Sequence, residues 1–198
     1  MAFAEPGPAT DNYGMQTAQF KNQFLIAMPG QVAGDFARSV TLLADHNDDG
    51  AMGLVINKPS DLSLVDMLGQ LDIEAHVDRD MPVYWGGPVQ TERGFVLHTD
   101  EGDWESSLHI EGGLAITTSR DILEAIGNGF GPSAYLITLG YAGWGAGQLE
   151  SEILANSWLT APSKSAIIFQ SPAERRWADA TGLLGLEAYQ LSGAVGHA

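Results

Sequence analysis

The segment that decides the fold is the longest uncharged stretch of the chain, residues 125–149, with the sequence AIGNGFGPSAYLITLGYAGWGAGQL. Its length would suit a membrane-spanning helix, but its many glycines and Pro132 cannot be held in one continuous helix in lipid. Its centre, YLITL at residues 135–139, is typical of a buried strand. We therefore predict a buried strand between glycine-rich turns, followed by a helix over residues 148–158.

Short apolar runs bounded by turn residues flank this segment on both sides. Polar or glycine-rich turns join residues 38–44 to 52–56 and residues 107–110 to 114–117, which predicts two β-hairpins. A capped helix over residues 36–43 is the competing interpretation of the first run. Further strands are predicted at residues 24–28, 81–84, 94–99 and 166–169.

Helices are expected where a capping residue precedes an apolar stripe. Such starts stand at residues 60–61, at Ser119 and at Pro172. The last of these helices would place Trp177 and Leu183 in the core. Hairpins interleaved with helices indicate an α+β domain with a mixed sheet, because a strictly alternating chain would instead form a parallel sheet.

The 198 residues are enough for one ordinary domain. Residues 1–20 are small and polar and are interrupted by Gly and Pro, so we expect a flexible tail before a single domain over residues 21–198. The tail has no Lys or Arg and no unbroken apolar run, so it does not match an export signal. The cytoplasm is therefore the expected compartment.

The chain is strongly acidic, with 9 Lys and Arg against 25 Asp and Glu and a formal net charge of −16. Such a surface repels nucleic-acid phosphates and anionic membranes, so we expect no direct DNA binding and no membrane association. The absence of Cys excludes disulfides, thiol nucleophiles and thiolate metal ligands. Direct DNA binding would need a basic face around Arg175 and Arg176, which we expect on an exposed helix face.

Asp45, Asn47, Asp49 and Gly50 match the beginning of a calcium-binding loop. The last ligand of such a loop should be a bidentate Glu, but Ile56 stands at that position. The flanking runs are also predicted as strands, whereas the calcium motif needs helices. We therefore interpret this segment as the polar tip of a hairpin, and we expect neither a metal nor a cofactor.

Residues 139–150 place a glycine-rich loop between a strand and a helix, which is the usual setting of a phosphate site. The details do not fit, because Ala146 stands where a P-loop has Lys and Gln148 stands where a dinucleotide fingerprint has its third Gly. Tyr141 and Trp144 in this loop are either core residues or recognition anchors. Both interpretations stay open.

Several separated blocks of the sequence resemble the YqgE/AlgH family, over about residues 20–198. They are LIAMP (25–29), HN (46–47), GAMGLVINKP (50–59), GGPV (86–89), GFVLH (94–98), LGYAGW (139–144), GQLE (147–150) and GHA (196–198).

The resemblance implies a small bacterial cytoplasmic protein with a bifurcated, mostly antiparallel β-sheet that has a barrel-like part and is surrounded by helices. It also implies a role in transcriptional regulation, and it brings no catalytic residues with it. The chain is acidic and has no helix-turn-helix pattern. We therefore expect regulation through binding to a protein partner and not through direct binding to DNA.

We expect a non-enzymatic binding or adaptor protein that recognises a protein partner or a small ligand. The reason is that aromatic and polar groups on glycine-rich loops at strand ends are typical of binding sites. The expected surface comprises Asn57, Gly86, Gly87, Pro88, His98, Tyr141, Trp144, Gln148, Glu150 and Glu152.

The alternative is an enzyme acting on a small neutral or cationic substrate, with His98 as general base and Glu150 or Glu152 as its partner. This alternative requires His98 to lie beside one of the two carboxylates in the folded chain. The competing interpretation is structural, because a lone His at a strand end is typically a hydrogen-bonded residue of the fold.

Overall fold

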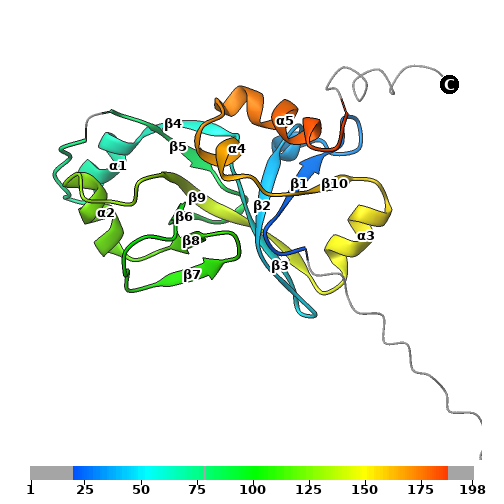
Figure 1. Cartoon of the computed structure of the whole chain (residues 1–198), viewed down its shortest axis with the longest axis horizontal. Helices are drawn as coiled ribbons and strands as arrows, with labels where there is room; N and C mark the ends of the chain where they lie inside the picture. The colour runs from blue at the N-terminus through cyan, green and yellow to red at the C-terminus, as the bar shows by residue number, and fades with distance from the viewer. Residues whose placement is uncertain (1–19, 78, 187–198) are drawn as a thin grey trace, which may run out of the picture.

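One long strand, β9 (Tyr135–Gly145), runs through the length of the molecule and joins two lobes (Figure 1). The computed structural model describes residues 20–77 and 79–186. The predicted tail, except for its last residue, and the C-terminal end of the predicted domain therefore lie outside the described residues. The first part of β9 is the predicted buried strand over residues 135–139, which is confirmed.

The two lobes are two halves of one sheet. Its strands follow the order β10-β1-β2-β3-β9-β6-β8-β7, and β5 pairs with both β4 and β9 beside this path. The pairing of β5 with β9 is parallel and the other pairings are antiparallel. The first half contains β1 (Gln23–Ala27), β2 (Val40–Asn47), β3 (Gly50–Val55) and β10 (Trp158–Pro162). The second contains β4 (Pro59–Ser63), β5 (Pro82–Trp85), β6 (Val89–Thr99), β7 (Ser107–Ile110) and β8 (Leu114–Thr117).

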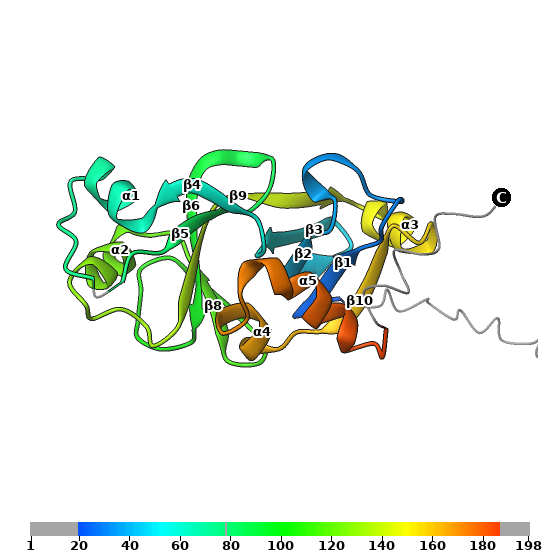
Figure 2. The same ribbon diagram turned by 90° about the horizontal axis from the view of Figure 1, so that it is seen from above.

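The helices lie around this curled sheet, and the predicted α+β class is confirmed. Figure 2 shows α1 and α2 at one end of the molecule, α3 near the other end, and α4 and α5 beside the first half of the sheet. No helix in the described ranges is long and apolar enough to cross a membrane. The bounds are α1 (Leu64–Gln70), α2 (Arg120–Gly127), α3 (Gln148–Leu154), α4 (Ser165–Phe169) and α5 (Ala173–Gly182), with a 3-10 turn η1 (Gly34–Phe36).

β9 changes partners at Gly140. Before this glycine the strand pairs with β6, for example Ile137 with Val96. Just after it Tyr141 still pairs with Val89 of β6, and residues 142–145 then pair with β3. Gly140 has a φ of +72°, and a Cβ on it would lie 2.4 Å from the carbonyl oxygen of Gly87. Only glycine meets both conditions, because other residues rarely adopt that φ and none could fit against the neighbouring backbone.

The predicted glycine-rich loop is therefore wrong over most of its length, since β9 continues to Gly145. Glycine is usually unfavourable within strands, and this is why the sequence pattern predicts a turn there. Tertiary contact outweighs that preference, because residues 142–145 are held on β3 by a continuous antiparallel register. Only residues 146–147 form the turn before α3.

Both predicted hairpins are confirmed, and the competing helix over residues 36–43 is wrong, because residues 40–47 form β2. The predicted strand at residues 166–169 is also wrong and is part of α4. A short apolar run cannot by itself distinguish a strand from a buried helical turn. Here Ile167 and Ile168 are buried while the rest of the run is more exposed.

Two further boundaries and one core residue differ from the prediction. The first helix begins after Ser63, whose side chain accepts a hydrogen bond from the Asp66 amide, since the preceding residues pair with β5. The predicted helix over residues 148–158 ends at Leu154, and Trp158 instead begins β10. At the C-terminal side Trp177 is buried as expected, whereas Leu183 is 40% exposed and is not a core residue.

Arg176 corrects the expectation that Arg175 and Arg176 form one exposed basic face. Its side chain is buried and donates from Nη1 to the Ile56 carbonyl and from Nε to the Ser171 carbonyl, at 3.1 Å for the latter. Its guanidinium lies 5.0 Å from the centre of the Tyr84 ring. Burial lowers the pKa of this guanidinium from its ordinary value. One of the two cations is thus used inside the fold, to fasten α5 to the sheet.

We expect Arg176→Met to reduce the free energy of unfolding by about 2 kcal/mol, because two carbonyl oxygens lose a charged donor. Arg175→Met is the matched control, and as an exposed substitution it should change stability by less than about 0.5 kcal/mol. Denaturant unfolding of both variants measures this difference. An Arg176→Met variant as stable as the wild type would show that the desolvation cost of the buried guanidinium outweighs its hydrogen bonds.

Candidate functional site

Four residues of the expected surface lie close together where β9 meets α3, namely Trp144, Gln148, Glu150 and Glu152. Gln148 accepts a hydrogen bond from the Gly145 amide at 3.0 Å and donates to Oε1 of Glu152 at 2.9 Å. The other oxygen of Glu152 accepts from the indole nitrogens of Trp144 and Trp158, at 2.9 and 2.8 Å. Glu152 is thus already engaged by three donors, and it fixes α3 on the sheet.

Trp144 is a core residue in this arrangement. The residue is 7% exposed, and its ring stands edge-on to that of Trp158, with 6.1 Å between ring centres. The alternation of β9 turns Trp144 to one face of the sheet and Tyr141 to the other. Tyr141 is half-buried, with its ring 5.6 Å from that of Phe95. Trp144 is thus held in the core, whereas the Tyr141 ring packs beside Phe95.

Glu150 pairs with a histidine that the sequence pattern did not single out. Nε2 of His46 lies 2.8 Å from Oε1 of Glu150, and Nδ1 of His46 accepts from the Phe20 amide at 3.2 Å. This places the ring hydrogen on Nε2, so the imidazole donates to the carboxylate. His46 is 1% exposed, which leaves its ring no access to a substrate. The pair ties Phe20, the hairpin and α3 together.

We expect Glu152→Ala to reduce the free energy of unfolding by about 3 kcal/mol, because two buried indole N–H groups lose their acceptor. Glu152→Gln keeps a carbonyl oxygen at the same reach and should lose less than half as much. Denaturant unfolding followed by tryptophan fluorescence measures both. Equal stability of the two variants would contradict an anchoring role for this carboxylate.

His98 is buried on the sheet of the other lobe. Its Nδ1–H donates to the Thr99 carbonyl at 2.7 Å, and its Nε2 accepts from the Thr117 hydroxyl at 2.8 Å. Burial lowers the pKa of the imidazole from its ordinary value. Both ring nitrogens are therefore occupied, and the neutral form is favoured.

His98 and the two glutamates lie at opposite ends of β9. His98 pairs with Tyr135 at the beginning of the strand, whereas α3 follows Gly145 at its end. At the usual rise per residue the strand between them extends for about 30 Å. The structure does not bring together the base and the carboxylate that the enzyme alternative requires.

The lowered pKa makes His98 a pH-dependent contributor to stability. As the pH falls below about 6.5, the unfolded chain takes up this proton before the folded chain does. The contribution of neutral His98 is thus complete above that pH, and it is lost as the pH falls through the lower pKa of the folded state.

We therefore expect the free energy of unfolding to fall more steeply in the wild type than in His98→Gln between about pH 7 and about pH 5. The difference in slope is at most about 1.4 kcal/mol per pH unit, the limit for one proton. Denaturant unfolding at a series of pH values checks this, with the slope compared and not the absolute stability. Parallel stability–pH profiles of the wild type and His98→Gln would contradict a lowered pKa of His98 in the folded state.

The other expected site residues serve the fold in the described structure. Asn57 accepts from the Val40 amide at 2.8 Å and donates to the Arg38 carbonyl at 2.9 Å. Gly86 and Gly87 pack against the backbone of residues 140–142, where a Cβ on Gly87 would lie 2.1 Å from the carbonyl carbon of Tyr141. Pro88 is exposed beside them.

The hairpin tip at residues 48–49 is polar, as expected. Asp45 pairs with Lys21 at 2.6 Å, and the Asp49 amide donates to the Asn47 side chain at 2.9 Å. Within the described ranges no three His, Cys, Asp or Glu residues are grouped so that they could hold a metal ion.

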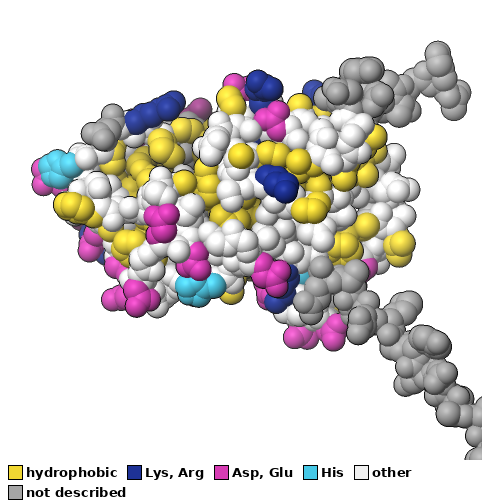
Figure 3. All heavy atoms as spheres, in the orientation of Figure 1, with side chains coloured by type: hydrophobic (Ala, Val, Ile, Leu, Met, Phe, Trp, Pro, Cys, Tyr) yellow, Lys and Arg dark blue, Asp and Glu magenta, His cyan; other side chains and the backbone are white. Residues whose placement is uncertain are grey.

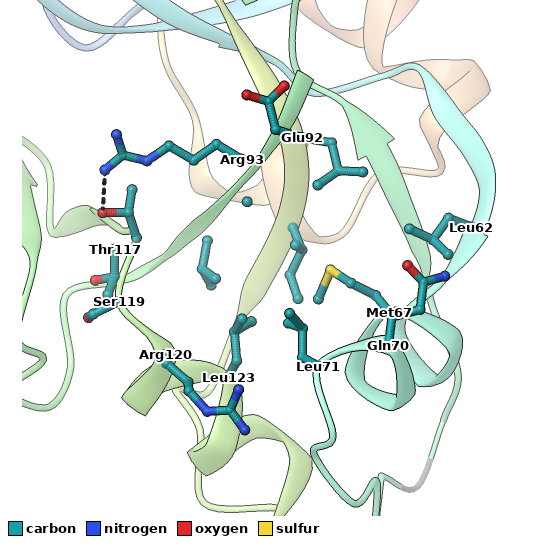
Figure 4. Close-up of a pocket in the computed structure, with 15 residues that line it drawn as sticks. Leu62, Met67, Gln70, Leu71, Glu92, Arg93, Thr117, Ser119, Arg120 and Leu123 are labelled. Atoms are coloured by element: carbon teal, nitrogen blue, oxygen red, sulfur yellow. Dashed lines mark hydrogen bonds between the residues drawn. The ribbon is translucent and has the colours of Figure 1, made fainter. Parts of the chain in front are cut away.

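The structure has a cleft between α1 and α2 that the sequence pattern did not predict (Figure 4). Its volume is about 460 Å³, within the usual range for small-molecule sites. Its floor is the face of β6 and β9 on which Val96 opposes Ile137 and Gly94 opposes Leu139. The apolar walls are Leu62, Met67 and Leu71 on the side of α1 and Leu123 on the side of α2.

Gly94 leaves the floor of this cleft open. A Cβ built on Gly94 would meet no atom within 4 Å, and its φ lies outside the region that favours glycine. A larger side chain could therefore be accommodated there without strain, but it would project into the cleft. The periodicity of residues 94–99 predicts the strand, but it cannot tell that one face stays uncovered.

The rim of the cleft carries its polar groups. Arg93 donates from Nη2 to the Thr118 hydroxyl at 3.2 Å, and its guanidinium lies 5.6 Å from the Phe95 ring centre. Arg120 pairs with Glu124 at 2.6 Å. On the face of the molecule shown in Figure 3, acidic side chains are spread over the surface and the few Lys and Arg are scattered. The cleft is thus an apolar hollow whose mouth carries Arg93, Arg120 and the acidic Glu92.

Comparisons with known proteins all indicate the same family. The model of a family described as AlgH-like matches residues 24–189. A UPF0301 protein from Methylococcus capsulatus is 53% identical over 178 residues, covering 89% of this chain and 95% of the relative. A UPF0301 protein from Ralstonia nicotianae is 54% identical over 179 residues, covering 89% and 94%.

Two solved structures share the fold. The solution structure of the AlgH protein from Pseudomonas aeruginosa has a TM-score of 0.74 and 48% identity, covering 92% of this chain and 97% of that one. The crystal structure of protein DIP2367 from Corynebacterium diphtheriae has a TM-score of 0.65 and 21% identity, covering 90% and 87%, and shows similarity of fold alone.

Proposed function

The chain belongs to the AlgH-like family, and we propose that it is a non-enzymatic binding protein that takes a small, largely apolar ligand into the cleft between α1 and α2. The observation that carries the proposal is the cleft itself, an open hollow of about 460 Å³ with an apolar floor. Apolar surface that a ligand can cover is the main source of affinity in small-molecule sites.

The cleft is built on rigid elements. Its floor residues Val96 and Ile137 belong to the same buried cluster as Leu68 of α1 and Ile122 of α2, so both walls are fastened to the floor by packing. A site that exists before the ligand arrives loses less conformational entropy on binding. Leu71, just after α1, lines the cleft and is itself 38% exposed, so its apolar side chain can be reached from solvent.

A ligand-dependent interaction with a protein partner fits the regulatory role that the family resemblance implies. The chain has too few cations for a DNA-binding face, and Arg176 is used inside the fold. Occupation of the cleft would instead change the surface formed by α1 and α2. Regulation by this route is indirect and needs no contact with nucleic acid.

Gly94→Leu tests the proposed function, because its side chain would fill the cleft from the floor. The probe is N-phenyl-1-naphthylamine, a neutral apolar dye whose fluorescence rises on binding. We expect saturable binding to the wild type and at least about tenfold weaker binding to the variant.

Gly182→Leu is the matched control, since a Cβ there also meets no atom within 4 Å and Gly182 lies in α5, away from the cleft. It should bind the dye like the wild type. Shifts of the Ile137 and Leu123 methyl signals on titration of the wild type give a second readout. Unchanged dye binding by a folded Gly94→Leu, or no binding by the wild type, would refute the proposal.

A further inference from the structure

Resting on that function, we propose that the ligand is an amphipathic monoanion and that Arg93 binds its anionic group at the mouth of the cleft. The ligand class is a single apolar chain that ends in one carboxylate, such as a medium-chain fatty acid. Arg93 is then the residue that sets the charge specificity of the site.

The partners of Arg93 are the first argument. Among the residues that the structure describes, no carboxylate lies within 4.0 Å of its guanidinium, although acids outnumber Lys and Arg by 25 to 9 in the chain. Its contacts are neutral, to the Thr118 hydroxyl, to the Gln90 side chain at 3.4 Å and to the Phe95 ring. These groups orient the guanidinium without neutralising its charge.

Arg120 supplies the contrast on the same rim. Its Nε donates to the Glu124 carboxylate at 2.6 Å, so its charge is already compensated within α2. Arg93 is therefore the cation at this cleft with charge to offer an incoming anion. Planar guanidinium groups bind carboxylates through two parallel hydrogen bonds, which adds geometric selectivity to the attraction.

The position of Arg93 fits the head of a ligand whose body lies in the cleft. Figure 4 shows its side chain extending along one edge of the cavity, above the apolar residues Leu71, Met67 and Leu123. Gly94, the next residue, leaves open space over the floor. The guanidinium lies at the edge of the cleft on the Phe95 side of β6, so an apolar chain over Gly94 would have to place its carboxylate across that edge.

An acidic residue at the mouth of the cleft limits the charge that the site accepts. Glu92 also lines the mouth, and Figure 4 shows its carboxylate turned away from the middle of the cavity. A single negative charge can pair with Arg93 while the Glu92 carboxylate points away from the cavity. A second negative charge would have no further uncompensated cation and would be repelled by Glu92. A monoanion is thus the form that the rim favours.

The test compares decanoate, decanol and decyltrimethylammonium, which share a ten-carbon chain and differ in charge. Each displaces N-phenyl-1-naphthylamine from the wild type, from Arg93→Met and from Arg120→Met, below its micelle concentration and at low salt. We expect the wild type to bind decanoate about tenfold more tightly than decanol, and the cation most weakly.

Arg93→Met should abolish the preference for decanoate while changing decanol binding by less than about twofold. Arg120→Met should keep the preference, because that charge is already paired. Arg93→Lys keeps the positive charge but loses the two parallel N–H donors of the guanidinium, so it should retain part of the preference for decanoate that Arg93→Met loses. Thermal unfolding of each variant confirms that it is folded.

Two failures are distinguishable. If decanol and the dye bind but decanoate has no advantage, or Arg93→Met keeps the advantage, the monoanion assignment is wrong and the apolar cleft stands as the site. If neither decanol nor the dye binds to the wild type, the proposed function itself is wrong, and the assignment to Arg93 falls with it.

Discussion

The structure depends on one close backbone crossing. Gly86 and Gly87, which lead from β5 to β6, pass against Gly140 and Tyr141 of β9 at distances that leave no room for a Cβ. At this crossing β9 leaves β6 and joins β3, so that a single strand serves both halves of the sheet. Without it the two lobes would need separate central strands, and the long uncharged segment would have no continuous partner to pair with.

The crossing also decides which parts of β9 can carry a site. Before Gly140 the strand forms the floor of the cleft, where Ile137 and Leu139 face the space between α1 and α2. Beyond it the strand leads to α3, whose carboxylates are engaged by His46 and by two tryptophans. The polar cluster that resembles an active site thus holds the fold together, while the hollow that can take a ligand is mostly apolar. Buried polar groups of a fold are normally hydrogen-bonded in this way.

The few cations of this acidic chain have distinct tasks. Arg176 is buried under α5 with backbone carbonyls as acceptors, and Arg120 is paired within its own helix. Arg93 keeps an uncompensated charge at the edge of the cleft. In a protein whose overall field repels anions, such a local charge beside apolar surface can select an anion only at short range, since more distant charges are screened by salt.

The sequence by itself determined the α+β class, both hairpins, the buried strand at residues 135–139 and the family resemblance, because these depend on local periodicity, turn chemistry and ordered sequence blocks. It did predict that Trp144, Gln148, Glu150 and Glu152 lie near one another, since they are close in the chain. Only the tertiary structure decided that residues 140–145 are strand, that His98 is far from Glu150, and that His46 is its partner across 104 positions. Tertiary structure also left Gly94 uncovered. The physical reason is that a strand pattern indicates which residues can be buried. Which element covers each face of the strand is decided by packing between segments that are distant in the sequence.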